Sequence, residues 1–262
     1  MTGIAPDNIL EFADVSVEFG GVKALSAVSF GVPTGQICGV IGPNGAGKTT
    51  LFNVASSLQP VTSGTIWVQG RKLPSARPHE LVRRGLARTF QHVGLFTSMS
   101  VLDNIMVGAA APWSARWPTR YLGVPPPRRI EREIRASAEA MLDLLDLGDL
   151  RAKGVNELPF GSAKRVELAR ALAAQPQVLL LDEPAGGLTR REVDEFGGLI
   201  ATAASDLALT VVIVEHHMGL VSSLCERLVV LDHGVVVADG DVQETLKSDV
   251  VVAAYFGSRA DR

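Results

Sequence analysis

The chain has 262 residues, of which 47% are hydrophobic and 20% are charged, and its formal net charge is −3. This length and composition suit one large α/β domain, or one domain with an insertion, and the acidic balance disfavours a general nucleic-acid binder. Its two cysteines, Cys38 and Cys225, have neither metal-ligand spacing nor the pattern of a disulfide framework, which excludes a small secreted scaffold and suits a reducing cytosol.

The first third of the chain is expected to consist mostly of strands. Residues 1–7 lack the basic and apolar regions of a secretory signal. Apolar and polar residues partly alternate from Phe12 to Phe19, as in a half-buried antiparallel strand, and Gly20-Gly21 turns the chain towards a second strand at Val22–Phe30. Three further elements are expected: a turn and strand at 62–68, a short helix at 80–84, and a strand at 85–91 that ends on Gln91.

A glycine-rich loop lies between a predicted buried strand at Gln36–Ile41 and a predicted helix at Thr49–Ser57. It satisfies the pattern G-x-x-x-x-G-K-[ST], in which glycines let backbone N–H groups turn towards an anion. Lys48 places a positive charge on the β- and γ-phosphates, and the Thr49 hydroxyl can ligate Mg²⁺. Strand, loop and helix N-terminus together predict a nucleoside triphosphate site. Its candidate binding residues are Gly42, Pro43, Asn44, Gly45, Ala46, Gly47, Lys48, Thr49 and Thr50.

The uncharged run at 24–47 is interrupted by polar residues and glycines throughout, so it predicts buried strands and not a membrane span. From about residue 92 the pattern of apolar residues changes. Helical spacing of apolar residues predicts helices at Val101–Val107 and Ile130–Leu147. The stretch at 109–127 between them is rich in proline and aromatic residues and is expected to be an irregular surface loop, in which Trp113, Trp117 and Tyr121 pack locally.

Six arginines and two glutamates lie between Arg116 and Arg135 in this otherwise acidic chain. A solvated helix face accounts for such a run of charges. The functional alternative is that this face docks on the cytoplasmic leaflet of a membrane or on a membrane subunit.

Strands and helices alternate again in the last third. Val178–Leu181 is an apolar run of the buried parallel type, and Thr189 with Glu192 forms a capping box that opens a helix. Three more buried strands are expected at 210–214, 228–231 and 235–238.

Two carboxylates, Asp182 and Glu183, directly follow the apolar strand at Val178–Leu181. They lie at its carboxyl end, where α/β folds bind ligands. Because successive strand residues face opposite ways, the pair can divide its roles. Asp182 can belong to the Mg²⁺ shell, while Glu183 reaches the water that attacks the γ-phosphate.

In this order the motifs resemble those of the ATP-binding subunits of ABC transporters, over nearly the whole chain. The glycine loop matches Walker A, and the strand with its two carboxylates matches Walker B. Gln91, in Arg88-Thr89-Phe90-Gln91, matches the glutamine that senses Mg²⁺ and couples to the membrane subunits. His216 matches the switch histidine, and Phe19 occupies the place of the aromatic that stacks on adenine. Residues 158–162 stand where the signature loop Leu-Ser-Gly-Gly-Gln belongs, and 165–172 looks like its helix.

The resemblance implies a P-loop NTPase (RecA-like) α/β core with an antiparallel β subdomain and an inserted helical subdomain. That subdomain covers about 92–170, includes the signature loop, and belongs to a single nucleotide-binding domain over 1–262. The implied catalytic residues are Lys48, Gln91, Glu183 and His216. The implied Mg²⁺ residues are Thr49, Gln91 and Asp182. Nucleotide contacts come from Phe19, the glycine loop and, towards a partner's ATP, Gly161 and Ser162.

Several segments look like those of the branched-chain amino-acid uptake ATPases, among them 88–91, Val101-Leu102-Asp103-Asn104 and Val214-Glu215-His216. Lipopolysaccharide-export ATPases are near relatives and form the alternative, as does a non-transport ABC ATPase. The implied assembly contains a second ATP-binding subunit, identical or different, and two integral-membrane permease subunits. An external solute-binding protein acts indirectly, no nucleic acid takes part, and the chain is peripheral at the cytoplasmic face of the cell membrane.

The chain departs from the family pattern at three places. Pro159 and Phe160 replace the signature serine and first glycine, the loop at 185–189 has no aspartate, and His217 stands where these importers tend to carry aspartate. Either backbone N–H groups of Gly161 and Ser162 hold the partner's γ-phosphate, helped by the Ser162 hydroxyl, or this signature loop is degenerate and its heterodimer has one active site.

Overall fold

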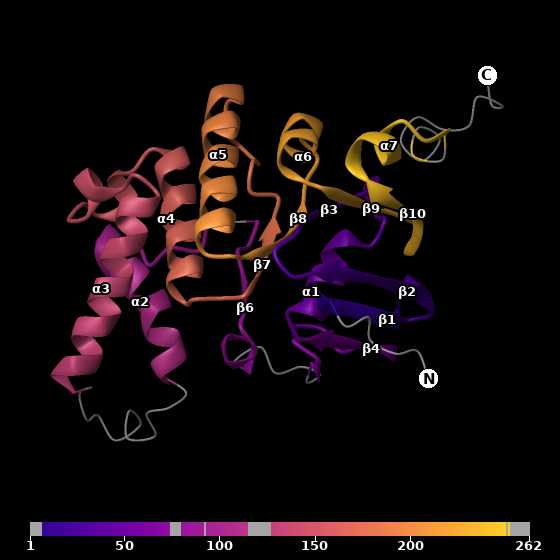
Figure 1. The fold of residues 1–262 in the computed structure, drawn as a ribbon, viewed down its shortest axis with the longest axis horizontal. Helices are drawn as coiled ribbons and strands as arrows, with labels where there is room; N and C mark the ends of the chain where they lie inside the picture. Colours follow the sequence, from indigo (N-terminus) through magenta and orange to yellow (C-terminus); the bar gives the residue numbers. More distant parts are fainter. Residues whose placement is uncertain (1–6, 74–79, 92, 115–126, 250, 252–262) are drawn as a thin grey trace.

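The computed structural model describes residues 7–73, 80–91, 93–114, 127–249 and 251. These residues form a four-stranded sheet in the order β2-β1-β4-β5 and a six-stranded sheet in the order β10-β9-β3-β8-β7-β6. Figure 1 shows the antiparallel strands β1, β2 and β4 near one end of an elongated molecule, with helices α2, α3 and α4 at the other end. The six-stranded sheet extends from β6 and β7, on the side of these helices, to β9 and β10, which lie over the antiparallel strands.

The four-stranded sheet is built around β1, which pairs antiparallel with both of its neighbours. Alternate residues of β1 are buried, and the rings of Phe12 and Phe30 stack with their centroids 4.6 Å apart. This face packs with residues of β3 and α1 in one hydrophobic cluster. The antiparallel strands predicted at the N-terminus are therefore present, as β1 (Asn8–Phe19), β2 (Val22–Pro33), β4 (Ser63–Val68) and β5 (Arg71–Lys72).

Every residue of the three central strands β3, β8 and β7 is buried, because elements cover both faces of the six-stranded sheet. The strand β10 pairs antiparallel at the edge and is largely half-exposed, so the expected buried strand at 235–238 is instead an edge strand. The expected strand at 85–91 ends earlier than predicted, at Arg88. The six strands are β3 (Ile37–Ile41), β6 (Leu86–Arg88), β7 (Val178–Asp182), β8 (Thr210–Val214), β9 (Arg227–Asp232) and β10 (Val235–Asp241).

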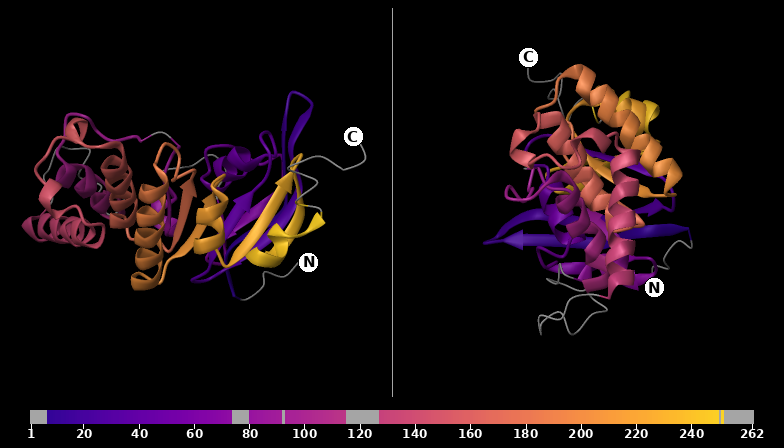
Figure 2. Two further views of the ribbon diagram at one scale, coloured as in Figure 1. Left: turned by 90° about the horizontal axis from the view of Figure 1, so that it is seen from above. Right: turned by 90° about the vertical axis from the view of Figure 1, so that its left-hand side faces the viewer.

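Helices cover the faces of this sheet, as Figures 1 and 2 show. The predicted capping box is present: Thr189 accepts a hydrogen bond from the Glu192 backbone N–H, and the Glu192 carboxylate accepts one from the Thr189 N–H. The short helix expected at 80–84 is a single 3₁₀ turn at Val82–Arg84. The covering helices are α1 (Lys48–Ala55), α5 (Arg190–Asp206), α6 (Met218–Leu224) and α7 (Val242–Leu246).

A separate layer of three helices contains α2 (Val101–Ser114), α3 (Arg128–Leu144) and α4 (Phe160–Ala173). The prediction of an irregular loop from residue 109 was wrong for its first six residues. Ala109, Ala110 and Ala111 favour helix, and Trp113 packs against the core, so α2 continues through Pro112 to Ser114. The rest of that loop, with Trp117 and Tyr121, lies outside the described residues except for Pro127.

The arginines of α3 lie on a solvated face, as predicted for that part of the basic stretch. Arg129 and Arg135 form i,i+4 ion pairs with Glu133 and Glu139, at 2.9 and 3.6 Å. Arg116 and Arg120 fall outside the described residues. Among the helices in the described ranges, none is both long enough and apolar enough to cross a membrane.

Both cysteines are free thiols in the interior. Burial raises the pKa of the Cys38 thiol well above its usual range and that of Cys225 to about 12. Both side chains therefore act as small apolar groups in the core.

Candidate active site

Four neighbouring parallel strands, β3, β8, β7 and β6, end at one edge of the large sheet. Each is followed by a side chain that the sequence singled out: Lys48 after β3, His216 after β8, Glu183 after β7 and Gln91 after β6. Because parallel strands share the direction of their carboxyl ends, their loops meet there.

The glycine-rich loop turns between β3 and α1 where two positions leave no room for a side chain. Gly47, the residue before α1, has φ 103°, and a Cβ there would lie 2.6 Å from the Ala24 carbonyl oxygen. A Cβ on Gly42 would collide with the backbone oxygen of Leu231. These contacts explain why both positions require glycine. Without side chains here, Gly47 can lie close to β2 and Gly42 close to β9.

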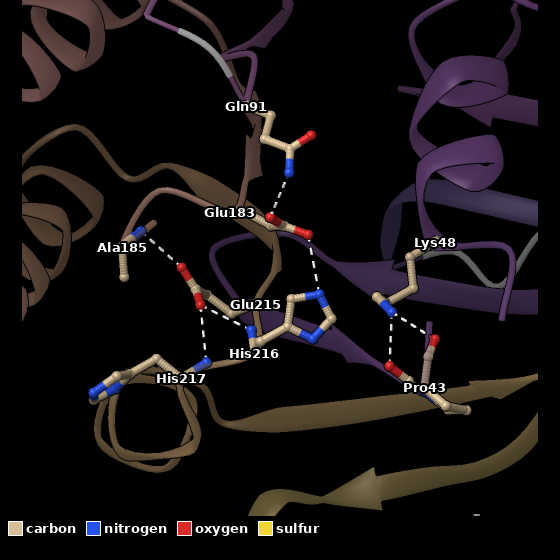
Figure 3. A network of polar contacts seen from close by, with 9 residues as sticks. Pro43, Lys48, Gln91, Glu183, Ala185, Glu215, His216 and His217 are labelled. Carbon is tan, nitrogen blue, oxygen red and sulfur yellow. Dashed lines mark hydrogen bonds and ion pairs between the residues drawn. The ribbon is translucent and has the colours of Figure 1, made fainter. Parts of the chain in front are cut away.

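Lys48 is buried, and its side chain folds back over the loop. Its Nζ donates hydrogen bonds to the Gly42 oxygen at 2.6 Å and to the Pro43 oxygen at 2.9 Å (Figure 3). Burial lowers the pKa of Lys48, and the nearby negative charge of Glu183 opposes that shift. The loop therefore holds a partly desolvated cation beside the carboxylate of Glu183.

Glu183 lies at the centre of the group. Its Oε2 accepts a hydrogen bond from Nε2 of Gln91 at 2.7 Å, and its Oε1 lies 3.0 Å from Nε2 of His216 (Figure 3). Its backbone has a positive φ of 47°, which is uncommon for any residue with a Cβ. Three predicted residues are thus brought into direct contact, and Lys48 lies close to them.

Asp182 contacts a different partner from Glu183. It is the last residue of β7, and its Oδ2 accepts a hydrogen bond from the buried guanidinium of Arg88 at 2.7 Å. In the sequence, Arg88 drew attention only as part of a segment that resembles the family. Its place three residues before Gln91 was the signal that could have identified it.

Glu215 is a second group that sequence reasoning did not single out. Its buried carboxylate accepts three backbone hydrogen bonds, from the N–H groups of Ala185, His216 and His217, at 2.7, 2.8 and 3.0 Å. It therefore ties the loop after β7 to the loop after β8. The signal was a carboxylate directly after a buried strand, the same signal that identified Asp182.

His217, one of the departures from the family pattern, caps a helix. Its Nδ1 accepts a hydrogen bond from the Leu220 N–H at 3.2 Å at the start of α6. Aspartate is a preferred residue for that position because its oxygen accepts the same kind of bond. The substitution therefore keeps the cap. Of these two adjacent histidines, His216 contacts Glu183 and His217 caps α6.

Phe19 lies at the end of β1 with 48% of its surface exposed, beside the β1–β2 turn. The turn between β9 and β10 connects this sheet to the glycine-rich loop. There, Gly234 donates to the Ala46 oxygen at 3.0 Å and accepts from the Ser26 N–H at 2.8 Å. An exposed ring on a sheet held against the loop is compatible with stacking on a base.

Gly161 and Ser162 lie in the first turn of α4, with Pro159 as the residue before the helix and no side-chain cap. The first N–H groups of a helix have no partners within it, so this end can attract an anion. Figure 1 shows α4 separated from α1 by α5 and the strands between them. The structure therefore does not bring Gly161 and Ser162 to Lys48 of the same chain.

Residues 25–186 match the family model described as "ABC transporter". The chain belongs to this family. It is 35% identical over 249 residues to the high-affinity branched-chain amino acid transport ATP-binding protein BraF of Pseudomonas aeruginosa, covering 95% of this chain and 98% of that protein. It is 33% identical to the corresponding protein LivG of Escherichia coli over the same shares of the two chains.

Solved ABC cassettes have the same fold. A nucleotide-free cassette from an ABC transporter aligns with a TM-score of 0.82 at 28% identity, covering 96% of this chain and all of that one. A cassette in its ADP conformation aligns with a TM-score of 0.83 at 29% identity, covering 96% and 99% of the two chains. The predicted fold class and the resemblance to ABC ATP-binding subunits are thereby confirmed, and the chain carries a nucleotide-binding ABC ATPase domain.

Proposed function

We propose that this chain is the ATP-binding and ATP-hydrolysing subunit of an ABC importer for branched-chain or related amino acids. The observation that carries the hydrolytic part is the position of Glu183, held by Gln91 and His216 beside Lys48. The names of BraF and LivG support import of amino acids over the export alternative.

The glycine-rich loop, from Gly42 to Thr50, would hold the phosphates of ATP. Its backbone N–H groups and the α1 N-terminus attract the anion, and Lys48 supplies a charge that can move from its two carbonyl partners to the phosphate oxygens. Glu183 would accept a proton from the attacking water as general base. Gln91 and His216 hold the two oxygens of that carboxylate in place.

Mg²⁺ fits the donors available here. Thr49 is an exposed residue at the start of α1, Asp182 offers a carboxylate, and the Gln91 amide oxygen points away from Glu183 in Figure 3. Mg²⁺ prefers such oxygen ligands and is usually held by one or two carboxylates together with substrate phosphates and water. The described part of the chain contains no group of three or more His, Cys, Asp or Glu side chains that could hold a metal ion. Bound Mg²⁺ would neutralise phosphate charge.

The proposed assembly of two ATP-binding subunits rests on the separation of the signature loop from the glycine-rich loop within one chain. Because Gly161 and Ser162 do not reach Lys48 of the same chain, they would contact the ATP of a second ATP-binding subunit, and two ATP molecules would lie between two subunits. Residues 92–170 would form the inserted helical subdomain of a single domain over 1–262. Two permease subunits would place this pair at the cytoplasmic face of the membrane, with an external solute-binding protein acting indirectly.

Purification of the tagged chain from membranes of its own cells tests this function. Integral-membrane subunits should copurify, and deletion of the chain should abolish uptake of radiolabelled leucine while glucose uptake continues. Copurification of ribosomes or DNA, with leucine uptake unchanged, would overturn the proposal in favour of a non-transport role.

Replacing Phe19 by alanine is expected to weaken ATP binding by about 1–3 kcal/mol, as for loss of base–aromatic stacking. Fluorescence titration with an ATP analogue measures the affinity. Val22→Ala is the control, because Val22 pairs with Phe19 across the hairpin and is itself 69% exposed. Unchanged affinity in Phe19→Ala would show that the ring does not contact the nucleotide.

The substitution Gly161→Asp is expected to abolish ATPase activity when measured with an unaltered partner subunit. A Cβ on Gly161 would lie 2.8 Å from Oε1 of Glu192, so the new carboxylate would crowd an existing one at the start of α4. Two acidic groups there would repel the γ-phosphate. Gly161→Ala is the steric control, since the Glu192 side chain can move aside, and it should keep substantial activity. Full activity in Gly161→Asp would mean that this signature loop is catalytically idle.

A further inference from the structure

Arg88 is a buried charge to which the proposed reaction assigns no role. Its side chain is only 5% exposed, yet it makes three hydrogen bonds. Nη2 donates to Asp182 Oδ2 at 2.7 Å, and Nη1 donates to Asn53 Oδ1 at 2.9 Å and to Ser56 Oγ at 2.7 Å. The guanidinium thus joins β6 to the end of β7 and to the last turn of α1.

Two aromatic rings enclose the same guanidinium. The Arg88 Cζ atom lies 5.0 Å from the ring centroid of Phe90 and 5.6 Å from that of Phe52. Phe90 belongs to the segment that leads to Gln91, whereas Phe52 belongs to α1. Rings at this range from a guanidinium attract it and keep water away, so the ion pair with Asp182 operates in a low dielectric.

Only a guanidinium can make this set of contacts. Its planar fork directs Nη1 and Nη2 along fixed, separate lines, whereas a lysine ammonium is a point charge on a flexible stem. An ion pair buried this deeply is a net gain only when its geometry is good and its other donors are satisfied. The two acceptors near the end of α1 meet that requirement for Nη1, and Asp182 meets it for Nη2, whereas Nε is buried without a hydrogen-bond partner among the described residues.

We propose that Arg88 is a positioning residue for magnesium, a role that rests on the proposed ATPase function. A carboxylate is flat, so holding Oδ2 of Asp182 sets the direction in which Oδ1 points. Within the described residues, the bond to Arg88 is the only side-chain hydrogen bond of Asp182. Arg88 therefore fixes the orientation in which Asp182 meets the metal that accompanies ATP, as outer-shell partners of metal ligands do.

The test is a Mg²⁺ titration of nucleotide binding without turnover. A fluorescent, non-hydrolysable ATP analogue is bound to purified protein in EDTA and then at increasing Mg²⁺ concentration. Arg88→Lys and Arg88→Met should raise the half-saturating Mg²⁺ concentration about tenfold, the range seen for outer-shell partners of metal ligands, and should leave affinity in EDTA unchanged. If Arg88→Met does not fold, the Asn53→Ala/Ser56→Ala double variant removes the anchors of Nη1 and should shift the titration in the same direction.

Arg227→Lys is the matched control. Arg227 donates to both carboxylate oxygens of Asp239, at 2.6 and 2.7 Å, and to the Gly31 oxygen at 2.8 Å, away from the glycine-rich loop. Its Mg²⁺ titration should overlay that of the wild type. The inference is overturned if Arg88→Lys also overlays the wild type, or if it loses affinity equally in EDTA and in Mg²⁺. If the wild type binds the analogue in neither condition, the proposed function fails instead.

Discussion

Replacing Lys48 by alanine is expected to abolish ATP hydrolysis and to weaken nucleotide binding by about 100-fold or more. Hydrogen bonds to a charged group contribute about 1.5–3 kcal/mol, and this ammonium would make such bonds to two phosphates. Burial lowers the pKa of Lys48, so the folded loop holds the charged form at a cost. Removing that charge should therefore leave the protein folded without nucleotide.

Titration with a fluorescent ATP analogue measures the loss, and a thermal melt without nucleotide serves as the folding control. Lys48→Arg separates charge from fit, because the broad guanidinium keeps the charge but cannot replace an ammonium that donates to Gly42 and Pro43. It should bind ATP better than Lys48→Ala and still fail to hydrolyse it. Wild-type affinity in Lys48→Ala would remove the glycine-rich loop from the nucleotide site.

The parts of the fold that sequence predicted well depend on local signals. The buried strands β3, β7 and β8 are short apolar runs bounded by turn residues, and the capping box at Thr189 is readable within four residues. The end of α2 was missed because proline and tryptophan composition outweighed three helix-favouring alanines. β10 is exposed because it lies at the edge of the sheet, and the spacing of apolar residues along the sequence does not reveal the order of the strands.

The motif residues of the candidate site were predicted from sequence patterns, whereas the contacts that support them were not. Arg88 and Asp182 are 94 positions apart, and Glu215 reaches Ala185 across 30 positions. No local spacing encodes such pairs, because they depend on which strands are neighbours in the sheet. His217 illustrates the converse case. Its residue type departs from the family pattern, yet its ring nitrogen caps α6. The capping hydrogen bond is therefore retained although the residue differs.

Glu183 is held in place by contacts of both its side chain and its backbone. Gln91 and His216 contact different oxygens of its carboxylate, and its positive φ shows that surrounding contacts hold the backbone in a sparsely populated region. Its N–H donates to the Val214 oxygen at 2.9 Å, which ties it to the strand that precedes His216. A substitution that keeps the shape of the side chain therefore isolates its charge and basicity.

Glu183→Gln is expected to lower turnover by roughly 10²- to 10⁴-fold while ATP affinity stays at the wild-type level, because an amide cannot accept the proton of the attacking water. The Gln91 contact survives, since the amide oxygen still accepts, so the geometry of the site is kept.

ATP should then accumulate between two closed subunits, and light scattering with Mg-ATP should show a doubled mass for the chain alone or with its partner subunit. Glu139→Gln, which removes a carboxylate paired with Arg135 on α3 and with Arg151, is the control and should hydrolyse ATP normally. Turnover near the wild-type rate in Glu183→Gln would show that another group is the general base. If no mixture of subunits gains mass, the two ATP molecules are not enclosed between two chains.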